Sequence, residues 1–177
     1  AGTAAADDPR LNCRLNETAH QPARIVVDGA LSLPLSLRFV TQASDGRSYL
    51  LTTKKAAVAF PEKRRQLTEA GVTVAEFESA DGRFRLPPQA LSDAAAAWGF
   101  DSVMVEGGCG LISSLAAADA FDAGEIFVAP VVLGDSEAVP LMDGFSPSVI
   151  DDGWRLPNAE TALYDGQVSY RFQKKVW

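Results

Sequence analysis

The chain has 177 residues, of which 47% are hydrophobic and 22% are charged. This composition excludes a disordered tail, a collagen and a coiled coil, and the length predicts a single domain over residues 1–177 with a real core. The net charge of −7 disfavours binding to nucleic acid or to an anionic membrane surface, but it is compatible with a local basic pocket for a small anion.

The cysteine and histidine content argues against a metal site and against a disulfide framework. Cys13 and Cys109 are far apart in the sequence and form no C-x-x-C motif, and His20 is the only histidine. No signal-peptide pattern opens the chain, and the apolar run 126–133 is too short to cross a bilayer. We therefore expect a cytoplasmic protein without a membrane partner.

Hydrophobic runs and breakers predict alternating strands and helices after a polar start. Residues 1–23 contain two breaker segments and are expected to be mostly loop. Buried or half-buried strands are predicted at 24–28, 48–53, 72–77, 102–106 and 125–133, with one or two antiparallel strands within 154–177. Helices are predicted at 61–70, 88–98 and about 111–118. This order predicts an α/β fold, with a mixed sheet that is parallel at its centre, antiparallel C-terminal strands and helices on both faces.

The strongest local signal for chemistry is Val105-Glu106-Gly107-Gly108-Cys109-Gly110-Leu111, in which a predicted strand runs into glycines and then a helix. Ligands of open α/β sheets bind beyond the carboxyl ends of strands, and free N–H groups at a helix start favour a phosphate. A carboxylate at Glu106 is expected to be partly desolvated, which favours a chemical role. The alternative is a tight strand-to-helix turn that needs glycine for steric reasons, with Glu106 bonded to the backbone.

Other segments allow both a functional and a structural interpretation. Asp7-Asp8 before Pro9 is typical of a turn, but one carboxylate could face a ligand while Arg14 binds a phosphate. Cys109 is either a low-pKa thiol at a helix start or a small residue that fills a tight loop. Lys54-Lys55 is either a solvated strand end or a phosphate contact.

Three segments occur in an order that points to one family. They are residues 2–14 (GTAAADDPRLNCR), residues 21–28 (QPARIVVD), and residues 103–108 (VMVEGG) running on to 126–134 (IFVAPVVLG). Together they resemble the reductase domain of the bifunctional riboflavin-biosynthesis deaminase/reductase. The resemblance implies a dihydrofolate-reductase-like fold. It also implies reduction of the ribosyl group of 5-amino-6-(5-phosphoribosylamino)uracil, a small phosphorylated pyrimidine, to a ribityl group with NADPH.

The resemblance also implies roles for individual residues. It assigns cofactor contacts to Thr3 and Asp7, and substrate contacts to Leu11, Arg14 and Glu106. Glu106 and Asp7 are the carboxylates expected near the developing charge. The cofactor's pyrophosphate is expected at Gly108, Cys109, Gly110, Leu111, Ile112, Ser113 and Ser114. The family commonly has Ser where this chain has Gly29, so only a backbone contact with the cofactor is expected there. Candidate partners for the cofactor's 2′-phosphate are Arg38, Lys54 and Lys55.

The chain departs from the family in two ways. It has no H-x-E or P-C-x-x-C zinc motif, so deamination is not expected. The strand and helix with which the family's reductase domain begins are not among these residues, so part of the substrate pocket is expected to be absent. Two alternatives stay open: a diaminopyrimidine ribosylamino-phosphate or folate-type reductase of the same fold, and a non-catalytic nucleotide-binding fragment. The apolar C-terminal strands also predict a homodimer.

Overall fold

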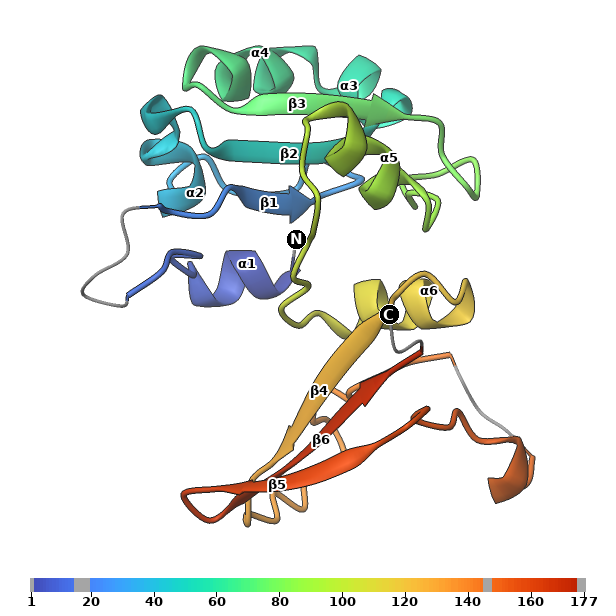
Figure 1. Cartoon of the computed structure of the whole chain (residues 1–177). Helices are drawn as coiled ribbons and strands as arrows, with labels where there is room; N and C mark the ends of the chain where they lie inside the picture. The colour runs from blue at the N-terminus through green and yellow to red at the C-terminus, as the bar shows by residue number, and fades with distance from the viewer. Residues whose placement is uncertain (1, 15–19, 145–147, 175–177) are drawn as a thin grey trace. The chain divides into compact units, whose positions relative to one another are not determined.

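The computed structural model describes residues 2–14, 20–144 and 148–174. Contacts divide the chain into two compact units, Ala1–Gly108 and Cys109–Trp177, and each unit is described by itself (Figure 1). None of the helices in the described part of the chain is long and apolar enough to cross a bilayer. That the chain forms a single domain stays a prediction.

The first unit contains a parallel sheet and most of the helices. Its elements are α1 (Gly2–Asp7), β1 (Arg24–Val27), α2 (Arg38–Thr41), the 3-10 turn Ala43–Asp45, β2 (Ser48–Thr53), α3 (Lys54–Ala59), α4 (Pro61–Glu69), β3 (Thr73–Phe77) and α5 (Ala90–Ala97). The strands run parallel in the order β1-β2-β3, with Leu50 of β2 between Val26 of β1 and Val74 of β3. The described strands 24–27, 48–53 and 73–77 therefore confirm the predicted parallel centre.

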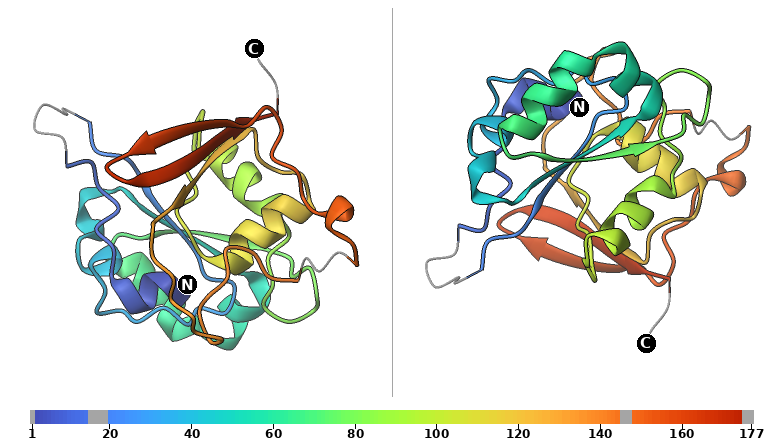
Figure 2. Two further views of the ribbon diagram at one scale, coloured as in Figure 1. Left: turned by 90° about the horizontal axis from the view of Figure 1, so that it is seen from below. Right: turned by 90° about the horizontal axis from the view of Figure 1, so that it is seen from above.

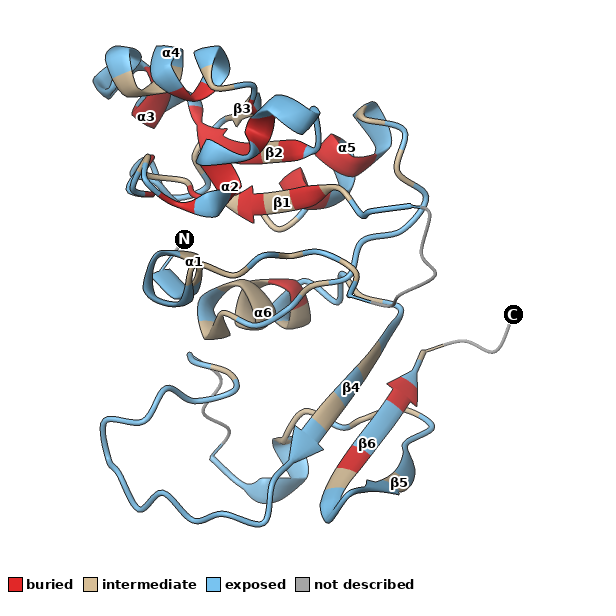
Figure 3. Ribbon diagram, turned by 90° about the vertical axis from the view of Figure 1, so that its left-hand side faces the viewer, coloured by how far each residue is buried: buried red, intermediate tan, exposed pale blue. Residues whose placement is uncertain are grey.

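The two faces of the parallel sheet are covered by different helices (Figure 2). On one face Leu50 packs in a buried cluster with Phe39 of α2 and Leu67 of α4. Each fully buried leucine in such a cluster stabilises the fold by roughly 1.5–3 kcal/mol. On the other face Tyr49 lies 4.7 Å from the ring of Trp98, the residue that ends α5. Alternation along β2 thus gives both faces a buried layer, and β2 is mostly red in Figure 3.

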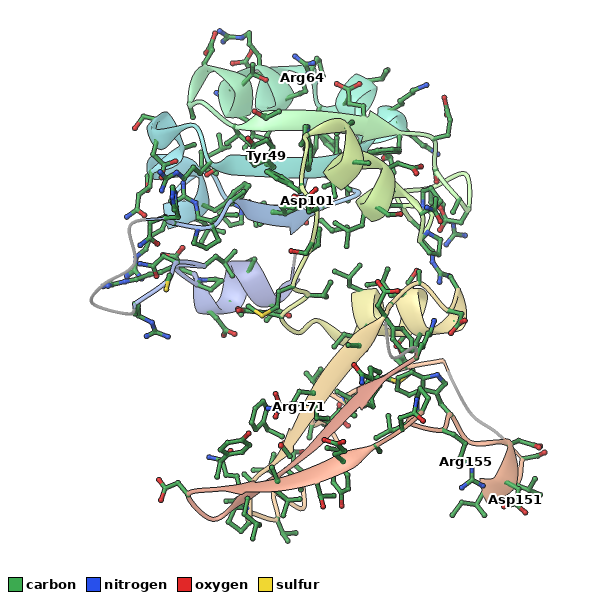
Figure 4. All side chains as sticks on the ribbon, in the orientation of Figure 1. Tyr49, Arg64, Asp101, Asp151, Arg155 and Arg171 are labelled. Atoms are coloured by element: carbon green, nitrogen blue, oxygen red, sulfur yellow. The ribbon has the colours of Figure 1, made fainter. Side chains whose placement is uncertain are left out.

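The second unit contains an antiparallel sheet in the order β4-β6-β5. Its elements are α6 (Cys109–Ala117), β4 (Ala123–Val128), the 3-10 turn Ile150–Asp152, β5 (Glu160–Tyr164) and β6 (Gln167–Gln173). A Cβ on Gly124 would lie 2.5 Å from the ring of Phe172, so glycine allows this ring to cross the neighbouring strand. Arg171, labelled in Figure 4, donates to Glu125 and to the hydroxyl of Tyr164 on this sheet.

Two strand predictions are corrected by the structure. Residues 102–106 form no strand, and Met104 is 80% exposed, because no backbone in the described part of the chain pairs with this segment. An apolar run becomes a strand only where a partner accepts its hydrogen bonds. The strand predicted at 125–133 ends at Val128, because a local turn around Pro130 leaves the next residues unpaired. Helices α1, α2 and α3 were not predicted from the sequence.

Candidate active site

The carboxyl ends of the three parallel strands meet at one edge of the first unit. Asp28-Gly29 follows β1, Lys54-Lys55 follows β2, and Glu78 follows β3. The chain then runs from the end of β3 to α5 as the loop seen beyond the arrowheads in Figure 1. This is the edge at which open α/β sheets bind ligands.

A buried carboxylate shapes the turn that follows β1. Asp28 is only 2% exposed, and its two oxygens accept hydrogen bonds from the N–H of Ser32 at 3.0 Å, the hydroxyl of Ser32 at 3.0 Å and the N–H of Leu33 at 2.7 Å. The bond from Leu33 satisfies a backbone donor that would otherwise be buried without a partner, and the two bonds from Ser32 are part-buried. Sequence reasoning did not single out Asp28, although an aspartate before glycine at a strand end is a turn signal.

Gly29 lies where three pieces of the first unit come together. Its carbonyl oxygen accepts a hydrogen bond from the hydroxyl of Thr53 at 2.7 Å. The same hydroxyl oxygen accepts from the N–H of Ala56 at 3.1 Å and so caps α3. A Cβ on Gly29 would lie 1.9 Å from the carbonyl oxygen of Phe84. Glycine at this position is therefore required by the approach of the loop that contains Phe84.

Helix α1 carries two of the predicted cofactor contacts. Thr3 and Asp7 are exposed and lie four residues apart on one helix, which places them on the same side of it. The hydroxyl of Thr3 lies 3.8 Å from the position of a Cβ on Gly108, so these two predicted residues are neighbours. Of the two aspartates in this segment, Asp8 has the structural role, because its carboxylate accepts a hydrogen bond from the N–H of Arg38 at 2.8 Å. Asp7 forms no hydrogen bond through its side chain within the described residues, which leaves its carboxylate available.

Leu11 lines a cavity of about 280 Å³ in the first unit. Arg24, the first residue of β1, and Asp45, which precedes β2, also line this cavity. The cavity therefore lies at the amino ends of these strands. The guanidinium of Arg24 donates to Asp45 at 2.6 Å and to the hydroxyl of Ser48 at 3.0 Å. Arg14 is exposed and does not line the cavity, so the structure does not bring Leu11 and Arg14 together there.

The segment with Glu106 differs from expectation in its burial. Glu106 is exposed, because the segment that carries it forms no strand and is not covered. The expected desolvation of this carboxylate was therefore wrong. Gly107 and Gly108 have φ of 69° and 84°, in the left-handed region that favours glycine, which fits the alternative of a tight turn, although no strand precedes it.

The remaining predicted cofactor residues belong to the second unit. Helix α6 begins at Cys109, two residues before the predicted start, and contains Gly110, Leu111, Ile112, Ser113 and Ser114. The hydroxyl of Ser113 donates to the carbonyl of Cys109 at 2.7 Å and accepts from the N–H of Asp143 at 2.7 Å. Its hydrogen-bonding capacity is therefore largely used inside this unit.

The three cations expected near a 2′-phosphate have other partners. Arg38 pairs with Asp8 at the start of α2. Lys54 donates to Glu78 at 2.7 Å, and this hydrogen bond and the carboxylate charge raise the pKa of Lys54. Lys55 donates to the carbonyl of Gly82 at 2.7 Å. In the part of the chain that the structure describes, no group of three or more His, Cys, Asp and Glu residues is placed to hold a metal ion.

Comparison with known proteins identifies similar sequences. The family described as RibD C-terminal domain matches residues 1–165. The riboflavin biosynthesis protein RibD of Bacillus amyloliquefaciens is 33% identical over 144 residues, which are 81% of this chain and 37% of that protein. The 2,5-diamino-6-ribosylamino-4(3H)-pyrimidinone 5′-phosphate reductase of Archaeoglobus fulgidus is 30% identical over 154 residues, which are 82% of this chain and 66% of that protein. This chain thus spans only part of the length of both relatives.

Solved structures confirm the expected fold class. Acinetobacter baumannii RibD, form 2, has a TM-score of 0.77 at 21% identity, over 97% of this chain and 44% of that chain. The Saccharomyces cerevisiae riboflavin biosynthesis reductase Rib7 has a TM-score of 0.71 at 18% identity, over 98% of this chain and 71% of that chain. At these identities the likeness establishes the fold alone.

Proposed function

The chain belongs to the RibD C-terminal domain family, and we propose that it reduces the ribosyl group of 5-amino-6-(5-phosphoribosylamino)uracil with NADPH. The observation that carries this proposal is the family match over residues 1–165, which includes every candidate site residue. When bound, the nicotinamide supplies a hydride to C1′ of the ring-opened ribosylamine. The protein supplies orientation and charge.

The glycine turn fits a nucleotide cofactor. Gly107 and Gly108 have left-handed φ, and a Cβ on Gly107 or Gly110 would meet nothing within 4 Å. The backbone in this turn is therefore open to close approach by a phosphate, as at other glycine-rich starts of helices. The hydroxyl of Thr3 lies 3.8 Å from the position of a Cβ on Gly108, so it is a further donor close to this turn. We also propose cofactor contacts at Gly108–Ser114, at Thr3 and Asp7, and at the backbone of Gly29, as the resemblance to the family implies.

The chain's own groups have separate tasks in this proposal. Glu106 and Asp7 stabilise the positive charge that develops at C1′, and the family resemblance puts Glu106 nearer the sugar. Both carboxylates are exposed and have no partner among the described residues, so they are available for this task. Arg14 binds the ribose phosphate, for which a guanidinium offers paired N–H donors. Leu11 contacts the substrate.

A second candidate keeps the fold and changes the pyrimidine. The Archaeoglobus fulgidus relative is named as a reductase of the diaminopyrimidinone ribosylamino phosphate, and 82% of this chain aligns with it. That substrate still carries the amino group that the first candidate has lost. The two candidates share the hydride step and differ only in the ring that the site must accept.

A turnover assay separates these candidates. The full-length protein is incubated with NADPH and either the deaminated or the non-deaminated pyrimidine, and the products are identified by mass spectrometry. We expect the ribitylamino product from the deaminated substrate, and a preference for the other pyrimidine would replace the first candidate by the second. Turnover of dihydrofolate would indicate the folate-type reductase, and NADPH binding without any turnover would indicate a non-catalytic fragment.

A homodimer is part of the same proposal. By strand register, Ile126 and Val128 of β4, Leu163 of β5, and Val168 and Tyr170 of β6 share one face of the antiparallel sheet. Leu163 is 78% exposed and Val128 is 49% exposed, so this apolar face supports a covering partner. Light scattering that gives the monomer mass over a wide concentration range would contradict the dimer. The cytoplasmic location stays a prediction.

A further inference from the structure

The loop between β3 and α5 is a built structure at the carboxyl edge of the parallel sheet. One carboxylate oxygen of Asp81 accepts from the hydroxyl of Ser79 at 2.8 Å, from the N–H of Arg83 at 2.8 Å and from the N–H of Arg85 at 3.3 Å. The N–H of Ala80 donates to the carbonyl of Arg85 at 2.8 Å, which closes the loop. These bonds fix the backbone of both arginines.

Two anchors hold the loop over the strand ends. The ammonium of Lys55, just after β2, donates to the carbonyl of Gly82 and lies 5.8 Å from the ring centre of Phe84. The carbonyl of Phe84 occupies the space that a side chain on Gly29, just after β1, would need. Leu86 is buried and lies 3.7 Å from the same position. The loop therefore crosses the ends of β1 and β2 after leaving β3.

The guanidinium groups of this loop are left without partners. Lys54 and Glu78 neutralise each other, and Lys55 is bound to a carbonyl. The side chains of Arg83 and Arg85 are exposed, and neither forms a hydrogen bond or ion pair with a described residue. This edge carries four cations, Lys54, Lys55, Arg83 and Arg85, against the three carboxylates of Asp28, Glu78 and Asp81, so it has a small positive excess in a chain whose net charge is −7.

We propose that Arg83 and Arg85 bind a phosphate monoester at the carboxyl edge of the parallel sheet. Guanidinium groups bind phosphate through paired N–H donors, and a backbone fixed in advance lowers the entropy that such binding costs. The inference rests on the proposed function, which offers two such esters: the 2′-phosphate of the cofactor and the 5-phosphate of the substrate. Arg83 and Arg85 are specificity-determining residues for whichever ester they hold.

The test is calorimetric titration of the full-length protein with two matched pairs of ligands. NADPH against NADH isolates the 2′-phosphate, and ribose 5-phosphate against ribose isolates the sugar phosphate. The variants are Arg83→Gln, Arg85→Gln and the double substitution. Arg47→Gln is the control, since Arg47 is exposed and precedes β2 at the opposite edge of the sheet.

Each substitution in the loop is expected to lower the affinity for one phosphorylated ligand about tenfold, the effect of one charge-assisted hydrogen bond. The affinity for the unphosphorylated counterpart is expected to stay within about twofold of the wild-type value. Loss of NADPH affinity alone assigns the site to the cofactor, and loss of ribose 5-phosphate affinity alone assigns it to the substrate. Unchanged affinity for both phosphorylated ligands in the double variant, as in Arg47→Gln, would overturn the proposal. A wild-type protein that binds neither nucleotide would contradict the proposed function, while the ribose 5-phosphate pair would still decide the role of the loop.

Discussion

The carbonyl oxygen of Phe84 lies 1.9 Å from the position that a Cβ atom on Gly29 would take. No side chain fits there unless the backbone of the loop moves. We predict that Gly29→Ala lowers the free energy of unfolding by about 1–3 kcal/mol, the usual effect of overpacking. Urea denaturation measures this. Gly2→Ala is the control, because a Cβ on Gly2 meets nothing within 4 Å. Equal midpoints for Gly29→Ala and the wild type would show that the loop is free to shift.

The three hydrogen bonds to Asp28 lead to a prediction about the stability of the fold. Asp28→Asn preserves the size of the side chain, but it replaces one of the two acceptor oxygens with an amide donor that faces a backbone N–H group. We expect a loss of about 1–3 kcal/mol in the free energy of unfolding, the cost of leaving a buried donor unsatisfied. Asp135→Asn in an exposed turn is the matched control, with an expected change below about 0.5 kcal/mol. If both variants unfold at the same urea concentration, Asp28 does not hold its turn.

The stability of the loop that carries Arg83 and Arg85 should depend on pH, because the carboxylate of Asp81 holds this loop together. The N–H of Arg83 and the hydroxyl of Ser79 hold the pKa of Asp81 below its ordinary value. Because the pKa is lowered in the folded state, the contribution of this carboxylate is complete above the unfolded pKa and is lost as the pH falls through the folded pKa. An NMR titration of the carboxyl carbon measures this pKa. Ser79→Ala should raise the pKa, and the same pKa in an unstructured peptide of this sequence would refute the expectation.

Glu106→Gln tests the proposed role of this carboxylate. Gln preserves the size and removes the charge that would face the developing cation, so kcat and kcat/KM should fall together by about 100-fold, or roughly 2.7 kcal/mol. NADPH affinity should change little, because the backbone of Gly108–Ser114 is proposed to hold the pyrophosphate. The measurement is steady-state turnover of the full-length protein. Near wild-type turnover at an unchanged unfolding temperature would make Glu106 a surface residue only.

The sequence predicted correctly those strands and helices that carry a strong signal within their own residues, such as a buried apolar run or a breaker at each end. Strand 48–53 was correct at both ends, because its run of apolar and β-branched residues is buried on both faces. Helix α4 follows from Pro61 at its start and Gly71 just beyond its end. Lys54-Lys55 was interpreted as a strand end or a phosphate contact, but these lysines begin helix α3. The helix start was not evident from the sequence, because the Thr53 cap depends on the turn after β2.

Features that depend on distant residues were not predictable in the same way. The segment 102–106 has the composition of a buried strand, but strand formation needs a paired backbone that its own sequence cannot supply. A tight turn that needs glycine at 107 and 108 could be offered as an alternative from the sequence, because the freedom to adopt left-handed φ is a property of the glycines themselves. The phosphate site proposed at Arg83 and Arg85 has no local signal in the sequence, because only the fold brings their loop across the ends of β1 and β2.

The most direct test of the account follows the hydride itself. The full-length protein is incubated with 5-amino-6-(5-phosphoribosylamino)uracil and NADPH that carries deuterium at C4 of the nicotinamide, on each face in turn, and the product is analysed by mass spectrometry. We predict a ribitylamino product with one deuterium at C1′ from one of the two labelled cofactors. A product without deuterium from either cofactor, or no product at all from a folded protein, would contradict it.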